Sequence, residues 1–261
     1  MDVTAYLDRI GVGDGVGADV RGLRLLHRAH LQTVPFENLS IHLGERIVLE
    51  PEALFDKVVR RRRGGFCYEL NGTFALLLEA LGFQVERVGA RVHSGSGRMG
   101  PPFDHMALLV TAADGDGPWL ADVGFGRNSV EPLDFRSRVN QGDPAGVFTL
   151  VELPGGDVDV VLDGVPQYRV EQRARELADF RPTCWWHATS PESHFGRSTV
   201  CSRLDGDGRV SLSGRTLIRT GGGERTETTL GTDEQVLAAY REHFGIVLTE
   251  MPRVVRPDDA S

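Results

Sequence analysis

The chain has 261 residues, of which 40% are hydrophobic and 25% are charged, and its formal net charge at pH 7 is −8. This composition is typical of a globular protein, and the acidic excess disfavours a nucleic acid as the main partner. The three cysteines form no Cys-x-x-Cys pair and leave one thiol over in any disulfide scheme. We find neither a signal-peptide pattern nor an apolar run of about 18 residues, so we expect a cytoplasmic protein with reduced thiols and no membrane partner.

Two helices are predicted before Pro35. The first covers residues 2–10, and the second begins at Asp19, a favourable N-cap, and ends before the proline. His27 and His30 stand three residues apart on the second helix and could in principle bind a metal. No cysteine or carboxylate ligand accompanies them nearby, so we interpret them as core or surface histidines and expect no metal.

A third helix is predicted to begin at Pro51, because proline suits the first helical position. It runs into four arginines at residues 60–63 and stops at the Gly64-Gly65 break. Arginines at the end of a helix complement its dipole, which explains this basic run without a nucleic acid.

Cys67 is predicted to lie on the first turn of a fourth helix. Apolar side chains recur after it at helical spacing, at Leu70, Phe74, Leu77, Leu78 and Leu81. Gly82 stands where a left-handed cap would end this helix. Unpaired N–H groups and the positive end of the dipole favour an anion at the first turn. We therefore predict that the thiol pKa, ordinarily about 8.5, is lowered by several units if an imidazolium lies nearby. A small buried cysteine that only packs is the alternative.

Beyond Gly82 the apolar period changes to two, which predicts strands. The first covers residues 83–92 with a bulge near Gly89, and a loop follows at residues 94–102. Phe103–Thr111 and Trp119–Phe125 are then predicted to form a hairpin around Asp114-Gly115.

This hairpin brings His105 and Asp122 together in either of two registers. A two-residue turn opposes residues 107 and 122, which makes His105 a diagonal neighbour of Asp122, whereas a four-residue loop sets the pair directly opposite. An odd-length loop without a bulge would separate them. An ionised aspartate on an apolar strand needs a partner, so we predict that the two side chains pair.

The second half of the chain continues the β pattern. Alternation from Val147 to Val170, with a turn at residues 154–157, predicts an antiparallel barrel or curled sheet, and residues 179–187 are predicted to be irregular. Three further strands are expected at residues 199–204, 210–213 and 216–220. A capping box at Thr232 predicts a final helix that ends at Gly245, followed by a disordered tail after Pro252.

Several segments resemble the motifs of arylamine N-acetyltransferases. The signature Arg-Gly-Gly-x-Cys-x-Glu-x-Asn is matched by Arg63, Gly64, Gly65, Cys67, Glu69 and Asn71. Further matches are Pro35–Leu39, Pro102–His105, Asp122–Gly126 and, more loosely, Pro191–Phe195. The order Cys, His, Asp, with spacings of 38 and 17 residues, also fits this family.

The resemblance and the pattern of elements imply an α+β fold with a papain-like Cys-His-Asp arrangement. We expect an N-terminal helical bundle at residues 1–85 that carries the nucleophile, and an antiparallel β-barrel at residues 86–190 that carries the histidine and the aspartate. A small α/β C-terminal lid is expected at residues 191–261.

The resemblance also implies an activity. Cys67 would take the acetyl group from acetyl-CoA, the co-substrate, and pass it to an arylamine, arylhydrazine or N-hydroxyarylamine. His105 would move the protons, and Asp122 would hold the imidazole in its working tautomer. Phe36, Phe103 and Phe125 are expected either to form a flat apolar slot for the aromatic substrate or to be core. The residues implied at the coenzyme cleft are Gly126, Ser193 and Phe195.

Other residues and other functions complete the expectations. Arg63, Glu69 and Asn71 are interpreted as structural, with Arg63 paired to Glu37 or Glu69, while Cys184 and Cys201 stand in strand-like contexts and are expected to be inert. An amide synthase of the same fold, which closes a macrolactam in ansamycin-type antibiotic assembly with a carrier-bound acyl donor, is one alternative. A thiol hydrolase, a transglutaminase-like enzyme and a non-enzymatic binding protein are the others. The sequence leaves the amine and the oligomeric state open.

Overall fold

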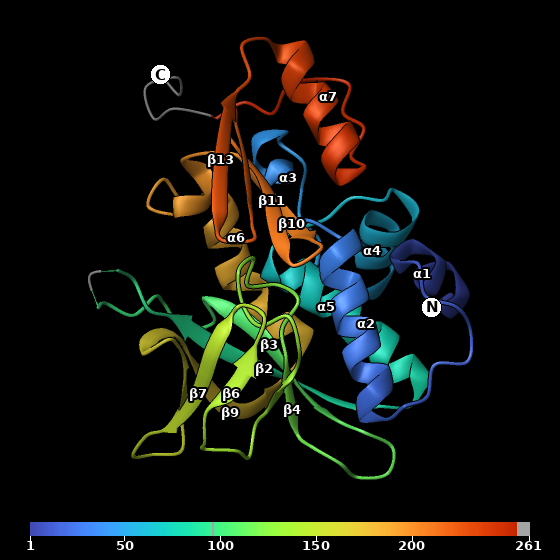
Figure 1. Ribbon diagram of the computed structural model, residues 1–261, viewed down its shortest axis with the longest axis vertical. Helices are drawn as coiled ribbons and strands as arrows, with labels where there is room; N and C mark the ends of the chain where they lie inside the picture. The colour runs from blue at the N-terminus through green and yellow to red at the C-terminus, as the bar shows by residue number, and fades with distance from the viewer. Residues whose placement is uncertain (96, 255–261) are drawn as a thin grey trace.

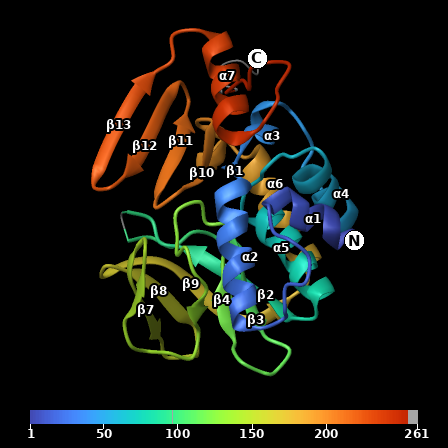
Figure 2. The same ribbon diagram turned by 45° about the vertical axis from the view of Figure 1, so that its right-hand side comes forward.

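The structure is a computed structural model that describes residues 1–95 and 97–254 (Figure 1). The helices of the first part of the chain lie beside two β-sheets, an eight-stranded one and a five-stranded one (Figure 2). No helix among the described residues is long and apolar enough to cross a membrane.

The N-terminal helices begin and end at capping residues. The side chains of Asp2 and Asp19 accept backbone N–H groups at the start of α1 and α2, and Gly82 ends α5 in the left-handed conformation. The helices predicted at these places are confirmed. The elements are α1 (Val3–Ile10), α2 (Val20–Thr33), α3 (Leu39–His42), α4 (Pro51–Phe55), the π-helical turn η1 (Asp56–Arg60) and α5 (Cys67–Leu81).

Helix α5 lies at the centre of the helical part. Its residues Leu70 and Phe74 pack in one cluster with residues of α1 and α2, and with Leu108 and Val110 of the neighbouring sheet. Complete burial of a side chain of this size contributes about 1.5–3 kcal/mol. The helix that carries Cys67 is therefore held from both sides.

A two-residue strand, β1 (Phe36–Glu37), crosses the start of α5. The N–H of Glu37 donates to the carbonyl of Gly65 at 2.8 Å. A Cβ on Gly64 would lie only 1.9 Å from the carbonyl oxygen of Pro35, so only glycine allows this approach. The Gly64-Gly65 break thus lets the segment after Pro35 lie directly against the residues that lead into Cys67.

The eight-stranded antiparallel sheet forms a nearly closed barrel, which confirms the predicted architecture in outline. Its strand order is β5-β4-β3-β2-β9-β8-β7-β6. The side-chain amide of Gln141, on one edge strand, accepts from the N–H and donates to the carbonyl of Asp134, on the other. The predicted irregularity near Gly89 is confirmed by a register shift between Val88 and Ala90. The strands are β2 (Gln84–Val92), β3 (His105–Thr111), β4 (Trp119–Ala121), β5 (Leu133–Asp134), β6 (Gln141–Asp143), β7 (Gly146–Glu152), β8 (Val158–Leu162) and β9 (Val165–Arg175).

The β3–β4 pairing follows the first of the two predicted registers. Leu108 opposes Ala121 and Val110 opposes Trp119, which is the register that sets residue 107 against residue 122. Strand β4 ends at Ala121, however, so the predicted strand to Phe125 is wrong beyond that point. Asp122 is the first residue after the strand.

The last third of the chain forms a second sheet with flanking helices. Its order is β1-β10-β11-β12-β13, so the first strand comes from the N-terminal part. The helix predicted at Thr232 is confirmed with its capping box, and it packs on this sheet. The elements are η2 (Leu177–Phe180), α6 (Arg181–Thr189), η3 (His194–Gly196), β10 (Val200–Asp205), β11 (Gly208–Ser213), β12 (Thr216–Gly221), β13 (Glu224–Thr229) and α7 (Asp233–Phe244).

Two expectations for this region are wrong. Residues 179–187 are not irregular, because they belong to η2 and α6, and Cys184 is therefore helical rather than strand-like. Strand β13 was not predicted. Two predictions fall partly outside the described residues. They are the tail, which includes residues 255–261, and the loop at 94–102, which includes residue 96. The division into three segments at residues 85 and 190 stays a prediction.

Candidate active site

Three elements bring the predicted catalytic residues to one place. Cys67 is the first residue of α5, His105 is the first residue of β3, and Asp122 follows β4. Cys67 and His105 line one cavity of about 290 Å³. Nε2 of His105 lies 2.8 Å from Oδ2 of Asp122, and the three residues are only 3%, 2% and 1% exposed.

A larger cavity of about 650 Å³ lies elsewhere, between residues 44–50 and α6. Its lining includes Cys184 but neither Cys67 nor His105. Size alone therefore does not mark the reactive centre, and the smaller cavity is the candidate active site.

The orientation of the His105 ring is fixed by its neighbours. The Phe125 ring meets it edge-on at 5.2 Å between centroids, and the Tyr168 ring lies at 5.1 Å. Nε2 is directed to Asp122, and no hydrogen bond joins the other ring nitrogen to the described part of the chain, so that nitrogen can serve a group in the cavity that His105 lines.

The Asp122 carboxylate accepts hydrogen bonds at both oxygens. Oδ1 receives the side-chain amide of Asn71 at 2.8 Å and the N–H of Gly124 at 3.0 Å, while Asn128 lies 3.4 Å from Oδ2. Burial alone would raise the pKa of Asp122, but the charge and hydrogen bond of His105 and the bonds from Asn71 and Gly124 hold it below its ordinary value. Asp122 is therefore ionised at neutral pH.

Asn71 connects the helix of the cysteine to the strands of the other two residues. Its amide nitrogen donates to the carbonyl of Met106 at 2.6 Å as well as to Asp122, and its oxygen accepts the N–H of Val123 at 2.9 Å. We interpreted Asn71 as a structural residue, and the structure shows that its side chain contacts the Asp122 carboxylate directly.

His27, on α2, supports Asp122 from behind. Its Nδ1 lies 3.0 Å from the carbonyl of Val130, and its Nε2 lies 3.1 Å from the backbone N–H of Asp122. A carbonyl only accepts and an amide N–H only donates, so the proton is on Nδ1 and the ring is neutral. Both nitrogens are occupied, which confirms His27 as a core histidine.

The thiol of Cys67 does not have the lowered pKa that we predicted. Burial raises the pKa of Cys67 well above its ordinary value, and the charges of Asp122 and Asp104 add to this, while a backbone hydrogen bond at Met106 opposes it. Desolvation disfavours a free thiolate more than the helix N-terminus favours it. The buried surroundings of Cys67 therefore favour the neutral thiol over the thiolate.

Gly124 allows the loop after Asp122 to lie against Cys67. A Cβ on Gly124 would lie 2.7 Å from Cα of Cys67 and 3.0 Å from its carbonyl oxygen. Only a residue without a side chain fits between the carboxylate loop and the helix start.

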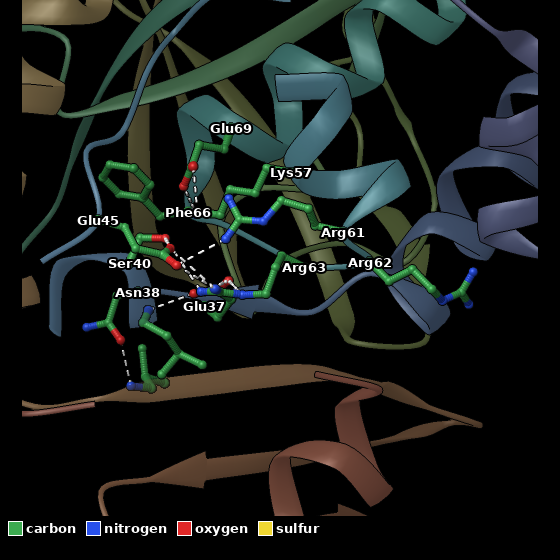
Figure 3. Close-up of polar contacts among 12 residues, drawn as sticks. Glu37, Asn38, Ser40, Glu45, Lys57, Arg61, Arg62, Arg63, Phe66 and Glu69 are labelled. Carbon is green, nitrogen blue, oxygen red and sulfur yellow. Dashed lines mark hydrogen bonds and ion pairs between the residues drawn. The ribbon is translucent and has the colours of Figure 1, made fainter. Parts of the chain in front are cut away.

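The charged signature residues Arg63 and Glu69 form separate ion pairs (Figure 3). Arg63 contacts Glu37 at 2.9 Å, which confirms one of the two predicted partners, and it also pairs with Glu45. Glu69 pairs with Lys57, the single lysine of the chain, at 2.6 Å. The Oε2 atom of Glu69 also accepts the N–H of Phe66 at 3.3 Å. These contacts hold the residues that lead into α5.

The predicted binding residues are distributed unequally around the cavity. Phe36, Phe125 and Phe195 line it. Phe103 does not, because its ring packs edge-on against Phe180 at 5.4 Å and under the Arg175 guanidinium. Gly126 packs on the Phe36 ring, and buried Ser193 accepts the N–H of Phe195 at 3.2 Å.

Comparison with known proteins identifies the class. Residues 19–253 match the family described as N-acetyltransferase, so the chain is an acetyltransferase. The arylamine N-acetyltransferase of Mycolicibacterium smegmatis is 34% identical over 260 residues, covering 96% of this chain and 94% of that protein. The solved structure of that enzyme superposes with a TM-score of 0.87 at 34% identity over 94% of this chain and 92% of the other.

A third similar protein is the Mycobacterium marinum arylamine N-acetyltransferase in complex with CoA, with a TM-score of 0.85 and 32% identity over 94% of this chain and 93% of that one. The chain belongs to the arylamine N-acetyltransferase family. These findings give no support to the macrolactam-forming alternative.

Proposed function

We propose that this enzyme moves the acetyl group of acetyl-CoA to an aromatic amine, hydrazine or N-hydroxyarylamine through an acetyl-Cys67 intermediate. One observation carries the proposal, namely that Cys67 and His105 line the same cavity while His105 contacts Asp122 at 2.8 Å. The similarity to a CoA-bound M. marinum enzyme supports CoA as the carrier.

In the first half-reaction the thiol proton of Cys67 passes to His105 as the sulfur attacks the thioester carbonyl. The carbon–sulfur bond to coenzyme A then breaks, and the imidazolium returns the proton to the departing CoA sulfur. Backbone N–H groups at the start of α5, around Cys67, are candidates for holding the developing oxyanion. The acetyl group stays on the enzyme as a thioester.

In the second half-reaction an amine nitrogen attacks the acetyl-Cys67 carbonyl while His105 accepts one of its protons. The bond to the Cys67 sulfur breaks, and the imidazolium proton returns to that sulfur, which restores the neutral thiol. Asp122 stays ionised throughout and stabilises the imidazolium. Acid–base assistance of this kind contributes about 10²–10⁴-fold.

The raised pKa of Cys67 fits this scheme better than a permanent thiolate does. Transfer of the proton to His105 creates the thiolate and the imidazolium together, and Asp122 compensates the new positive charge. Because the Cys67 thiolate forms only during the attack, the buried site does not have to stabilise an unpaired thiolate without solvent.

The aromatic side chains suggest where the substrates lie. Phe36 and Phe125 give the cavity apolar walls beside His105, which suits the flat ring of an aromatic acceptor, and Phe195 faces the same space. We propose that Gly126 and Ser193 act at the coenzyme cleft by supporting Phe36 and Phe195. All three cysteines are free, which suits a reducing compartment, so we propose a cytoplasmic location.

Intact-protein mass spectrometry tests the proposal. Acetyl-CoA without an amine is expected to add about 42 Da, one acetyl group in place of a proton, and digestion should locate it on Cys67. An aryl hydrazine should then remove the adduct. The Cys67→Ala variant is expected to stay unlabelled, and Cys184→Ala, the matched control, to be labelled normally. No adduct on the unaltered enzyme contradicts the proposal, and loss of the adduct to water at a rate independent of the hydrazine favours a hydrolase.

A further inference from the structure

The candidate active site contains a carboxylate that the proposed chemistry does not use. Asp104 directly precedes His105, is only 9% exposed and lines the same cavity as Cys67. Its Oδ2 accepts the N–H of Val92 at 3.2 Å, and its Oδ1 lies 3.0 Å from Nε2 of His187. Each oxygen thus has one polar neighbour from another element.

His187 anchors Asp104 from α6. The imidazole is 1% exposed, and its Nδ1 lies 3.3 Å from Oγ of Ser193, the residue that caps η3. The Nε2 atom lies 3.0 Å from Oδ1 of Asp104 but is not aligned for a hydrogen bond. Asp104 is thus fixed by two elements that are distant in sequence, β2 and α6.

The one ion-pair partner of Asp104 among the described residues, His187, does not line the cavity. Among the described residues that line the cavity, Asp104 is the one carboxylate, and none is an arginine or a lysine. Burial lowers the pKa of His194, also in the lining, so this imidazole is neutral at pH 7. His105 is engaged with Asp122.

We propose that Asp104 is a specificity-determining residue, which gives the acceptor pocket a negative wall and makes the enzyme select neutral or cationic aromatic amines and hydrazines over acceptors that carry a carboxylate. This inference rests on the proposed function, because it concerns the second substrate of the same site.

The physical basis is repulsion at short range in a poorly hydrated cavity. Two like charges about 6 Å apart at an effective dielectric constant of about 20 repel strongly enough to change a rate constant by roughly one hundredfold. Partial exposure of the acceptor's carboxylate reduces this effect. We therefore expect the charge of Asp104 to disfavour an anionic acceptor by about tenfold or more.

Two acceptors of equal shape and different charge test the inference, namely 4-aminobenzoate and 4-aminobenzamide. The measured quantity is the ratio of their kcat/KM values with acetyl-CoA, compared between the unaltered enzyme and Asp104→Asn, so that intrinsic reactivity cancels. The ratio of anionic to neutral acceptor is expected to rise by about tenfold or more in the variant. Asp116→Asn, which removes a charge from an exposed turn, should leave the ratio unchanged.

The outcomes separate this inference from the proposed function. Failure of the unaltered enzyme to acetylate 4-aminobenzamide or an aryl hydrazine overturns both. Turnover with the same acceptor ratio in Asp104→Asn overturns only the role of Asp104. If that variant does not fold, Asp104→Ser removes the same charge with a smaller side chain. Alkylation of Cys67 in the unaltered enzyme gives an independent readout. We expect 4-aminobenzamide to protect the thiol from alkylation more than 4-aminobenzoate does.

Discussion

The imidazole of His27 accepts the backbone N–H of Asp122 at 3.1 Å, across a sequence separation of 95 residues. The same ring donates to the carbonyl of Val130, so one side chain of α2 satisfies two buried backbone groups on the loop of the carboxylate. The position of Asp122 is therefore determined by a helix that contributes no residue to the cavity wall.

Replacement of His27 by leucine should destabilise the fold. It leaves the N–H of Asp122 and the carbonyl of Val130 unpaired inside the protein, at about 1–3 kcal/mol each. We expect urea denaturation to give a free energy of unfolding about 2–4 kcal/mol lower. His27→Gln, which keeps a donor and an acceptor, should recover part of this loss. Equal stability of His27→Leu and the unaltered protein would contradict the role assigned to His27.

Asn71→Ala should reduce activity, and it should also lower stability because the carbonyl of Met106 and the N–H of Val123 lose their partner. The amide holds Asp122 and the β3 backbone in one arrangement, and a displacement of about 1 Å in a catalytic group can reduce a rate about 10²-fold. We expect kcat to fall by about 10–100-fold in a folded protein. Thr73→Val is the control, because this buried threonine on the same helix bonds only within α5. A comparable fall in kcat in both variants would show that damage to α5, rather than contact with Asp122, is responsible.

The buried histidines of α2 should make stability depend on pH. Burial lowers the pKa of His27, and burial together with Arg9 lowers that of His30 well below its ordinary value. As pH falls below about 6.5, these two histidines bind protons in the unfolded chain but not in the folded chain. The contribution of the neutral histidines to the free energy of unfolding is therefore complete above pH 6.5 and is lost as pH falls.

The contribution of His30 can be isolated by substitution. His30→Leu should make the decrease in unfolding free energy between pH 6.5 and 5 shallower, by up to about 1.4 kcal/mol per pH unit. Tyr6→Phe removes the hydroxyl that contacts His30 but keeps the imidazole, so it should lower stability with little change in slope. Urea denaturation at several pH values gives the slope of unfolding free energy against pH for each variant. Parallel curves for His30→Leu and the unaltered protein would show that His30 does not cause the pH dependence.

Gly124→Ala should push the loop that follows Asp122 away from α5, the helix that carries Cys67. The added methyl would lie 2.7 Å from Cα of Cys67, so one of the two segments must move. Overpacking of this kind costs about 1–3 kcal/mol, and we expect acetyl-Cys67 formation to slow at least tenfold because Cys67 and His105 are no longer aligned. Gly142→Ala, where a Cβ has nothing within 4 Å, is the matched control and should behave as the unaltered enzyme.

The sequence predicted those parts of the site whose signals are local. The start of α5 at Cys67 follows from apolar periodicity, and its end follows from Gly82. The diagonal placement of His105 and Asp122 follows from one of the two hairpin registers that the turn allowed. The choice between these registers was not available from the sequence, because both keep the two side chains on one face.

Other features depend on contacts between distant segments and have no local signal. Nothing in the residues around His27 indicates that its partners are Asp122 and Val130. The raised pKa of Cys67 likewise reflects burial by segments that meet only in the fold. His187, the partner of Asp104, lies in a stretch that we predicted to be irregular.

The incorrectly predicted elements have a different physical origin. Strand β13 consists of exposed polar residues, so it lacks the alternation that marks a half-buried strand. In α6 the proline occupies the first helical turn, where it is tolerated, so the stretch that we predicted to be irregular can form a helix. Asp122 continues the register of β4 but leaves the ladder, because its loop turns inwards to meet α5.

Strand β1 joins segments that are made at very different times. Phe36 bridges to Gly65, and it also pairs with Ser202 of β10. A nascent chain emerges from its N-terminus and folds in that order, so α5 and its thiol exist before β10 has been synthesised. The wall that Phe195 and Val200 provide closes over Cys67 only after β10 has joined β1. During synthesis the thiol of Cys67 is therefore made well before the residues that complete the wall of its cavity.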